Sequence, residues 1–256
     1  MRILMSNDDG ISAPGLVQLA HSLAQVAEVY ISAPNSQRSA SSHAISFRDT
    51  LYAEPVNFRN DRIQAWAVSG TPVDCVKWGI HFFQSQGIAF DLMVSGINHG
   101  YNLATDVLYS GTVAAAGEAA MQGIPAIALS LGGIQTFPFD DVVVECRNTL
   151  PQMVNLNWPT DTFLNVNFPA GGKVSGQWRI TRLGTRGYED RFVEVTGDGG
   201  QKGYRYEGDA VLSTGGKDTD TLCVEEGDIS LTPLRYRFTN DEFLDSLKLK
   251  FAQIYK

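Results

Sequence analysis

Apolar and polar positions alternate in blocks along the first two thirds of the chain, and the blocks recur in one order. A short apolar run at residues 3–5 precedes a stretch at 14–27 whose apolar residues recur every three or four positions, and a second apolar run follows at 28–34. The two runs are typical of buried strands, and the stretch between them is typical of an amphipathic helix. Short connections favour a right-handed strand–helix–strand unit with parallel strands.

The same alternation continues to residue 169. Residues 35–46 are polar and predict a loop, and residues 47–69 predict an extended segment with one hairpin. Thr71, Pro72 and Asp74 are residues that favour the start of a helix, as N-cap, first helical position and first turn. The pattern predicts further strands at 91–100, 124–130 and 162–169, and further helices at 109–123 and 139–156.

The last third of the chain has a different character. It is rich in Gly, Thr and Asp and predicts extended hairpins, one of them including residues 228–238, while residues 239–256 form an amphipathic helical pattern. We therefore predict an α/β fold in a single domain, residues 1–256. It has a Rossmann-like, mostly parallel sheet with helices on both faces, a C-terminal β-hairpin arm and a terminal helix.

Composition narrows the class of protein. Hydrophobic residues make up 43% and charged residues 19% of the chain, which is typical of a globular protein. The net charge of −8 and the lack of a basic run argue against binding to nucleic-acid polymers or anionic membranes. The three cysteines are far apart, and the chain has no signal-like start and no apolar run of membrane-spanning length, so we expect a reducing, cytoplasmic location.

Polar side chains follow the predicted strands, and the first of them are adjacent acids. Asp8 and Asp9 stand between Asn7 and Gly10 directly after the first strand. A turn is one interpretation of these four residues, because Asn, Asp and Gly are common in turns. Two adjacent carboxylates also repel each other unless a proton or a cation lies between them. The sequence therefore leaves open both a turn and a cation site.

Other strand ends add oxygen atoms to the same predicted edge of the sheet. The second strand leads to Asn35 and Ser39, and the strand at 91–100 leads to Asn98 and Asn102. Ligands of open α/β sheets bind outside the carboxyl ends of the strands, so we expect these side chains to converge. A set made only of oxygen atoms suits Mg²⁺ or Mn²⁺ rather than zinc.

A helix start completes the candidate site. Ser110, Gly111 and Thr112 open the alanine-rich helix, where free N–H groups favour an anion, although an ordinary serine N-cap is the alternative. A cation site beside an anion-binding helix end indicates phosphate chemistry. Motifs for serine hydrolases, P-loop proteins, zinc proteases and dinucleotide-binding proteins are absent. His43 and His99 fall in loops near the site, and either is a candidate proton carrier.

Several segments in order along the chain resemble the SurE family of metal-dependent nucleotidases: residues 7–10, 95–119, 123–130, 164–169 and 219–234. The resemblance implies a phosphomonoesterase acting on nucleoside 5′-monophosphates, with 3′-nucleotides and short polyphosphate as further substrates. It also implies a homodimer or homotetramer formed partly by exchange of C-terminal segments. Ala40 and Ala104 stand where the family usually has glycine, and residues 205–221 follow the family's hairpin only loosely.

The resemblance assigns roles to particular residues. It implies one Mg²⁺ or Mn²⁺ ion per subunit, held by Asp8, Asp9, Ser39 and Asn98. One of the two aspartates would also orient or deprotonate the attacking water, and the sequence leaves open which of them does so. The phosphate-binding residues implied by the resemblance are Asn102, Ser110, Gly111 and Thr112.

Two other functions remain as alternatives. A phosphatase with an aspartyl-phosphate intermediate would also place acids after the first strand, but such enzymes separate the two acids by one residue. A non-catalytic module that senses nucleotides or cations, with the arm mediating assembly, would bind nucleotide without turnover. A trapped phosphoaspartate would favour the first alternative, and tight binding without hydrolysis the second.

Overall fold

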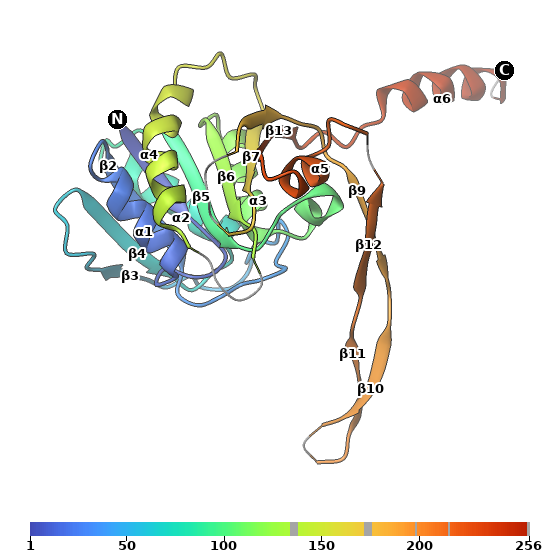
Figure 1. Ribbon diagram of the computed structural model, residues 1–256, viewed down its shortest axis with the longest axis horizontal. Coiled ribbons are helices and arrows are strands. Elements are labelled where there is room, and N and C mark those ends of the chain that lie inside the picture. Colours follow the sequence, from blue (N-terminus) through green and yellow to red (C-terminus); the bar gives the residue numbers. More distant parts are fainter. Residues whose placement is uncertain (134–137, 172–175, 198, 215, 255–256) are drawn as a thin grey trace.

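The computed structural model describes residues 1–133, 138–171, 176–197, 199–214 and 216–254. Its body is built on a nine-stranded sheet (Figure 1). Strands β4, β2, β1, β5, β6 and β7 are parallel to their neighbours, while β3 and β13 pair antiparallel with β4 and β7. In spatial order the strands are β3 (Ala53–Val56), β4 (Ile63–Val68), β2 (Glu28–Pro34), β1 (Arg2–Ser6), β5 (Leu92–His99), β6 (Ala126–Leu131), β7 (Thr162–Phe168), β13 (Ile229–Arg235) and β8 (Trp178–Ile180).

Helices cover both faces of the sheet, as predicted. Helices α1 (Pro14–Leu23) and α4 (Asp140–Met153) pack on one face, and α2 (Pro72–Gln84) and α3 (Gly111–Met121) pack on the other (Figure 1). The predicted start of α2 is confirmed, because the Thr71 hydroxyl accepts the N–H of Asp74 and the Asp74 carboxylate accepts the N–H of Thr71. Helix α1 is shorter than the predicted range 14–27, because the chain turns after Leu23 toward β2.

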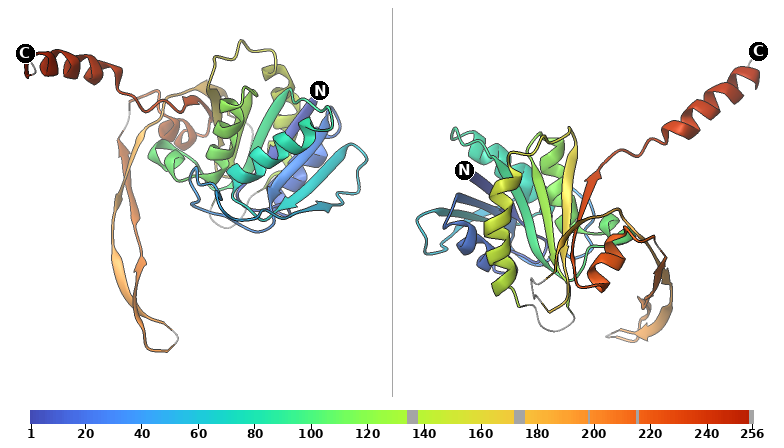
Figure 2. Two further views of the ribbon diagram at one scale, coloured as in Figure 1. Left: turned by 180° about the vertical axis from the view of Figure 1, so that it is seen from behind. Right: turned by 45° about the horizontal axis from the view of Figure 1, so that its top comes forward.

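The predicted arm and terminal helix are both present. Strands β9 (Thr185–Glu189) and β12 (Asp209–Thr214) pair antiparallel, and β10 (Phe192–Thr196) and β11 (Lys202–Tyr206) continue the arm toward its tip. Figure 1 shows the arm extending well beyond the body. Helix α6 (Asp241–Ile254) has no buried residue in its described part and projects away from the sheet (Figure 2).

Two features of the last third differ from the prediction of extended hairpins. Residues Asp220–Glu225 form a short helix, α5, and β13 joins the central sheet beside β7 instead of a separate hairpin. Asp220 explains the first difference. Its fully buried carboxylate accepts N–H groups from Ala104, Gly184 and Thr221, so contacts with distant segments fix the start of α5.

The order of the strands locates a ligand site. The chain passes from β1 to β2 on one side of β1, and β5 lies on the other side. In open α/β sheets, ligands bind at such a reversal, outside the carboxyl ends of the strands. The two loops that leave β1 and β5 at this edge carry Asp8, Asp9 and Asn102, and Asn98 lies at the end of β5 itself.

Candidate active site

The residues after β1 form a turn that also presents two carboxylates. Asn7 closes the turn, because its side chain donates to the carbonyl of Gly10 at 2.9 Å and accepts the N–H of Gly10 at 3.2 Å. Gly10 has a φ of +99°, which L side chains rarely adopt. The two interpretations of residues 7–10 are therefore compatible, since Asp8 and Asp9 both line a cavity of about 330 Å³ beside this turn.

Helix α3 fixes the position of the Asp8 side chain. Its side chain is 6% exposed, its Oδ1 accepts the hydroxyl of Thr112 at 2.6 Å, and its Oδ2 accepts the N–H of Thr112 at 3.2 Å. Burial raises the pKa of Asp8 and the charge of Asp9 adds to this, while the bonds from Thr112 act in the opposite direction. The side chains that line the cavity in the described residues include no lysine or arginine to balance the two acids.

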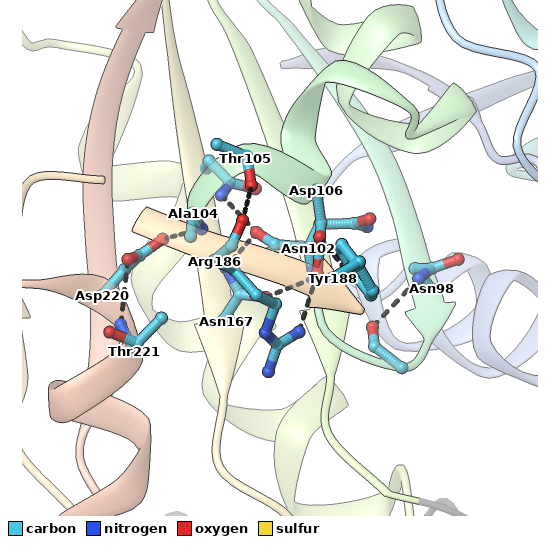
Figure 3. A network of polar contacts seen from close by, with 12 residues as sticks. Asn98, Asn102, Ala104, Thr105, Asp106, Asn167, Arg186, Tyr188, Asp220 and Thr221 are labelled. Atoms are coloured by element: carbon cyan, nitrogen blue, oxygen red, sulfur yellow. Dashed lines mark hydrogen bonds and ion pairs between the residues drawn. The ribbon is translucent and has the colours of Figure 1, made fainter. Parts of the chain in front are cut away.

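Asp9 and Asn98 face the cavity from β1 and β5. Oδ2 of Asp9 accepts the N–H of His99 at 3.1 Å, and within the described ranges its Oδ1 accepts no hydrogen bond. The amide nitrogen of Asn98 donates to the carbonyl of Gly100 at 2.9 Å (Figure 3). A carbonyl can only accept, so this bond fixes the amide orientation and leaves Oδ1 of Asn98 as an available acceptor.

The loop after β2 brings Ser39 to the same cavity. Arg38 donates its N–H to the carbonyl of Asp8 at 2.7 Å, and Gln37 donates to the Ser39 hydroxyl at 2.8 Å. Ser39 therefore lines the cavity together with Asp8, Asp9 and Asn98, as the sequence predicts. No group of three or more His, Cys, Asp or Glu side chains among the described residues could hold a metal ion.

This donor set fits a hard divalent cation. It supplies two carboxylates, a hydroxyl and an amide oxygen, all of them oxygen atoms, and one carboxylate oxygen accepts nothing from the protein. The repulsion between Asp8 and Asp9 in a partly desolvated cavity is the observation that most favours a cation between them.

Asn102 is positioned by buried polar side chains of the neighbouring strands. Its N–H donates to Asn167 Oδ1 at 2.8 Å, and its carbonyl accepts the amides of Asn165 and Asn167. Its own amide nitrogen lies 2.8 Å from the Ser130 hydroxyl. Figure 3 shows Asn167 beneath Asn102. Asn165 and Asn167 were not predicted as site residues, although two asparagines in a mainly apolar strand were a visible signal.

At the start of α3, the three predicted residues occupy different places. Ser110 lines the cavity and caps the helix, accepting the N–H of Val113 at 3.1 Å. Gly111 packs behind Asp8: a Cβ there would lie 2.9 Å from the Asp8 Cβ and 2.5 Å from the Ser41 hydroxyl. Thr112 is fully buried and contacts Asp8, so direct contact of Gly111 and Thr112 with a phosphate stays a prediction.

The base of the arm forms part of the cavity wall, which the sequence did not indicate. Asp106 follows Asn102 in the 3₁₀ helix Ala104–Leu108 and accepts the Tyr188 hydroxyl at 2.6 Å and the Arg186 guanidinium at 2.7 Å (Figure 3). Burial and the bond to Asp106 raise the pKa of Tyr188 to about 12, so its hydroxyl stays protonated and donates. Tyr188 and Asp106 both line the cavity.

The two candidate histidines have different surroundings. His99 lines the cavity, and its Nδ1 is 3.8 Å from Oδ2 of Asp9. His43 lies away from it, with its Nε2 3.0 Å from Glu118 Oε2 on α3. Lys77 on α2 also binds Glu118, at 2.9 Å. His43 thus connects the loop that carries Ser39 to the helices beneath it.

Ala40 and Ala104 stand at the two positions where the resemblance predicts glycine. Both have positive φ angles, +53° and +51°. This left-handed conformation favours glycine, the residue that the resemblance predicts at both positions. The chain keeps the backbone shape with the smallest side chain that has a Cβ.

Comparisons with known proteins all indicate one family. The family model described as "Survival protein SurE" matches residues 3–190. A 5′-nucleotidase SurE from Carboxydothermus hydrogenoformans is 41% identical over 97% of this chain and 95% of its own length. One from Petrotoga mobilis is 40% identical over 97% and 98%. The crystal structure of the SurE protein from Aquifex aeolicus superposes with a TM-score of 0.82 at 31% identity, covering 97% of this chain and 99% of that one.

Proposed function

The chain belongs to the SurE family and is a 5′-nucleotidase, and we propose that it hydrolyses nucleoside 5′-monophosphates to nucleoside and phosphate with one divalent metal ion per subunit. The observation that carries the proposal is the pair Asp8 and Asp9 at the carboxyl end of β1, in one cavity with Ser39 and Asn98 and with no basic side chain lining it in the described ranges. Nucleoside 3′-monophosphates and short polyphosphate belong to the proposed substrates.

Asp8, Asp9, Ser39 and Asn98 are the residues that would hold Mg²⁺ or Mn²⁺. When bound, such an ion supplies a positive charge that polarises the phosphoryl group and offsets the charge of its oxygens. Thr112 orients Asp8 for this role through two hydrogen bonds, and the bond from Asn98 to Gly100 aims the Asn98 amide oxygen.

We propose that the phosphate binds at the helix start and at Asn102. The N–H groups of Thr112 and Val113 are used by Asp8 and Ser110, while the N–H of Gly111 has no acceptor among the described residues. That N–H and the positive end of α3 favour an anion. The Ser130 hydroxyl can donate as well as accept, so the NH₂ group of Asn102 is free to turn toward the phosphate.

Of the two aspartates, we propose Asp9 as the one that acts on the attacking water. Both oxygens of Asp8 already accept hydrogen bonds from Thr112, whereas Oδ1 of Asp9 accepts none within the described part of the chain. Oδ1 of Asp9 would therefore accept a proton from the attacking water as its bond to phosphorus forms and the bond from phosphorus to the nucleoside 5′-oxygen breaks.

Phosphate release from a panel of nucleoside monophosphates tests the proposal. We expect release with added Mg²⁺ or Mn²⁺ and its loss with EDTA. Nucleotide binding without release under every divalent cation would support the sensing module, and a phosphoaspartate trapped on Asp8 or Asp9 would support the other phosphatase mechanism.

We infer that the arm and α6 assemble the chain into a homodimer or homotetramer. Helix α6 exposes a stripe of large apolar side chains, among them Phe243, Leu244, Phe251 and Ile254, and buries none in its described part. Such a stripe on a projecting helix is a typical contact surface for another chain. The three cysteines are free and buried, which supports the cytoplasm as the proposed compartment. No helix in the described ranges is long and apolar enough to cross a membrane.

A further inference from the structure

A second, larger cavity opens beside the candidate active site, where the arm meets the body. Its volume is about 710 Å³, against about 330 Å³ for the first cavity. Ala40, Tyr109 and Tyr188 line both, so the two cavities are adjacent and share this boundary. The larger cavity continues over Leu108 and Tyr206, and its wall is mainly aromatic and aliphatic.

Two of the three tyrosines are fixed by their hydroxyl groups. Tyr188 donates to Asp106 at 2.6 Å, and Tyr206 donates to Asp190 at 2.8 Å. All three rings keep part of their surface exposed, from 38% for Tyr188 to 61% for Tyr109. Rings that are already held in place lose little conformational freedom when a planar ligand stacks on them.

We propose that this cavity binds the base of the substrate nucleotide by stacking on its tyrosines. The inference rests on the proposed function, since it takes the phosphate to lie beside Asp8 and Asp9. The covalent order phosphate, sugar, base then sets the positions: the sugar lies at the shared boundary near Tyr109 and Tyr188, and the base lies toward Tyr206.

The polar groups of the cavity determine how strongly it discriminates between nucleotide bases. Three polar residues other than the tyrosines line it: Thr105, Arg186 and Asp190. Arg186 donates to Asp106, the Thr105 hydroxyl donates to the Arg186 carbonyl, and Asp190 accepts the Tyr206 hydroxyl. Because these groups are already bonded within the protein, they are poor readers of a base edge. Stacking tolerates every base, because every base has a π-face, and it favours the larger ring system. The site therefore accepts all common bases and prefers purine to pyrimidine nucleotides.

Kinetics with one substrate that carries a nucleobase and one that lacks it test this assignment. The substrates are AMP and ribose 5-phosphate, which share the sugar and phosphate, and the readout is the ratio of their kcat/KM values. Stacking of one base is worth about 1–3 kcal/mol, which is a factor of roughly 5 to 150. In Tyr206→Ala and Tyr109→Ala we expect this ratio to fall about tenfold or more. Tyr204→Ala is the control, since Tyr204 lies on the same strand, is 71% exposed and lines neither cavity.

Adenosine binding to the full chain, measured by calorimetry, gives a second readout that needs no turnover. We expect binding to weaken in Tyr206→Ala, to stay unchanged in Tyr204→Ala, and to recover in Tyr206→Phe, which keeps the ring. An unchanged ratio and unchanged adenosine binding in both alanine variants would overturn the base site. If the unmodified protein releases phosphate from neither substrate, the proposed function fails, and adenosine binding still decides the role of the cavity.

Discussion

Replacing Glu118 with glutamine tests how the Ser39 loop is attached to the body. Glu118 lies on α3, is 5% exposed, and receives hydrogen bonds from His43, Lys77 and Gln122 at 3.0, 2.9 and 2.8 Å. Burial opposes ionisation of this carboxyl, but the three bonds outweigh it and lower the pKa of Glu118 from 4.5 to about 2. The ionised form is therefore strongly favoured in the folded protein.

The lowered pKa of Glu118 determines how much folding stability the substitution is expected to remove. One pKa unit corresponds to about 1.36 kcal/mol, so a difference of roughly 2.5 corresponds to about 3 kcal/mol of folding stability at neutral pH. Glutamine still accepts from Lys77 through its oxygen, so we expect Glu118→Gln to lose about 1–3 kcal/mol. For a chain of this size, 1 kcal/mol lowers the melting temperature by about 2–4 °C.

The pH dependence of unfolding tests whether the ionised Glu118 carboxylate causes the loss of stability. A carboxyl whose pKa is lowered on folding stabilises the protein fully above its unfolded pKa of 4.5, and the contribution is lost as the pH falls toward 2. Urea unfolding at pH 7 and at steps down to pH 3 should show the two proteins converging in acid. Glu194→Gln is the control, because Glu194 pairs with Lys202 at 3.0 Å on the exposed arm, where such pairs contribute little. Equal losses in both variants, or a gap that does not narrow between pH 7 and pH 3, would refute the reasoning.

Three further predictions concern the metal site, the Ser39 loop and the assembly. Asp8→Asn should reduce phosphate release at least about 100-fold and abolish the rise in melting temperature caused by Mn²⁺; an unchanged rise would contradict the ligand assignment. Ala40→Gly should stabilise the protein by about 0.5–1 kcal/mol in urea unfolding, because relief at φ +53° outweighs the added freedom of the unfolded chain, and a loss of stability would argue against strain there. Deleting residues 239–256 should lower the particle mass in light scattering, and an unchanged mass would exclude α6 as a required contact.

The sequence predicted the body of the fold because its elements carry strong local signals. Strands β1, β2, β5, β6 and β7 are buried on both faces and appear as short apolar runs, and the start of α2 has its own capping residues. Helix α5 carries no such signal. Its start depends on Asp220 accepting N–H groups from Ala104 and Gly184, which are distant in sequence.

The candidate site likewise contains residues that the sequence predicted and residues that it did not. Six of its predicted residues converge on one cavity because each follows the carboxyl end of a parallel strand or opens the next helix: Asp8, Asp9, Ser39, Asn98, Asn102 and Ser110. Tyr188 and Asp106 were missed because they meet across 82 positions of sequence, through an arm whose path no periodicity describes. The roles of all these residues in metal binding and catalysis stay predictions.

The attachment of the arm at Asp106 limits how this protein can diverge. Arg186 and Tyr188 belong to the strand that begins the arm. Tyr188 forms a wall of both cavities, and Arg186 extends this wall in the larger one. A substitution that redirects the arm must therefore reshape that wall, so substrate preference and arm geometry are expected to evolve together. Relatives that keep residues 7–10 and 95–119 but carry a different arm should differ in the bases they accept, and exchanging arms between such relatives should transfer that preference.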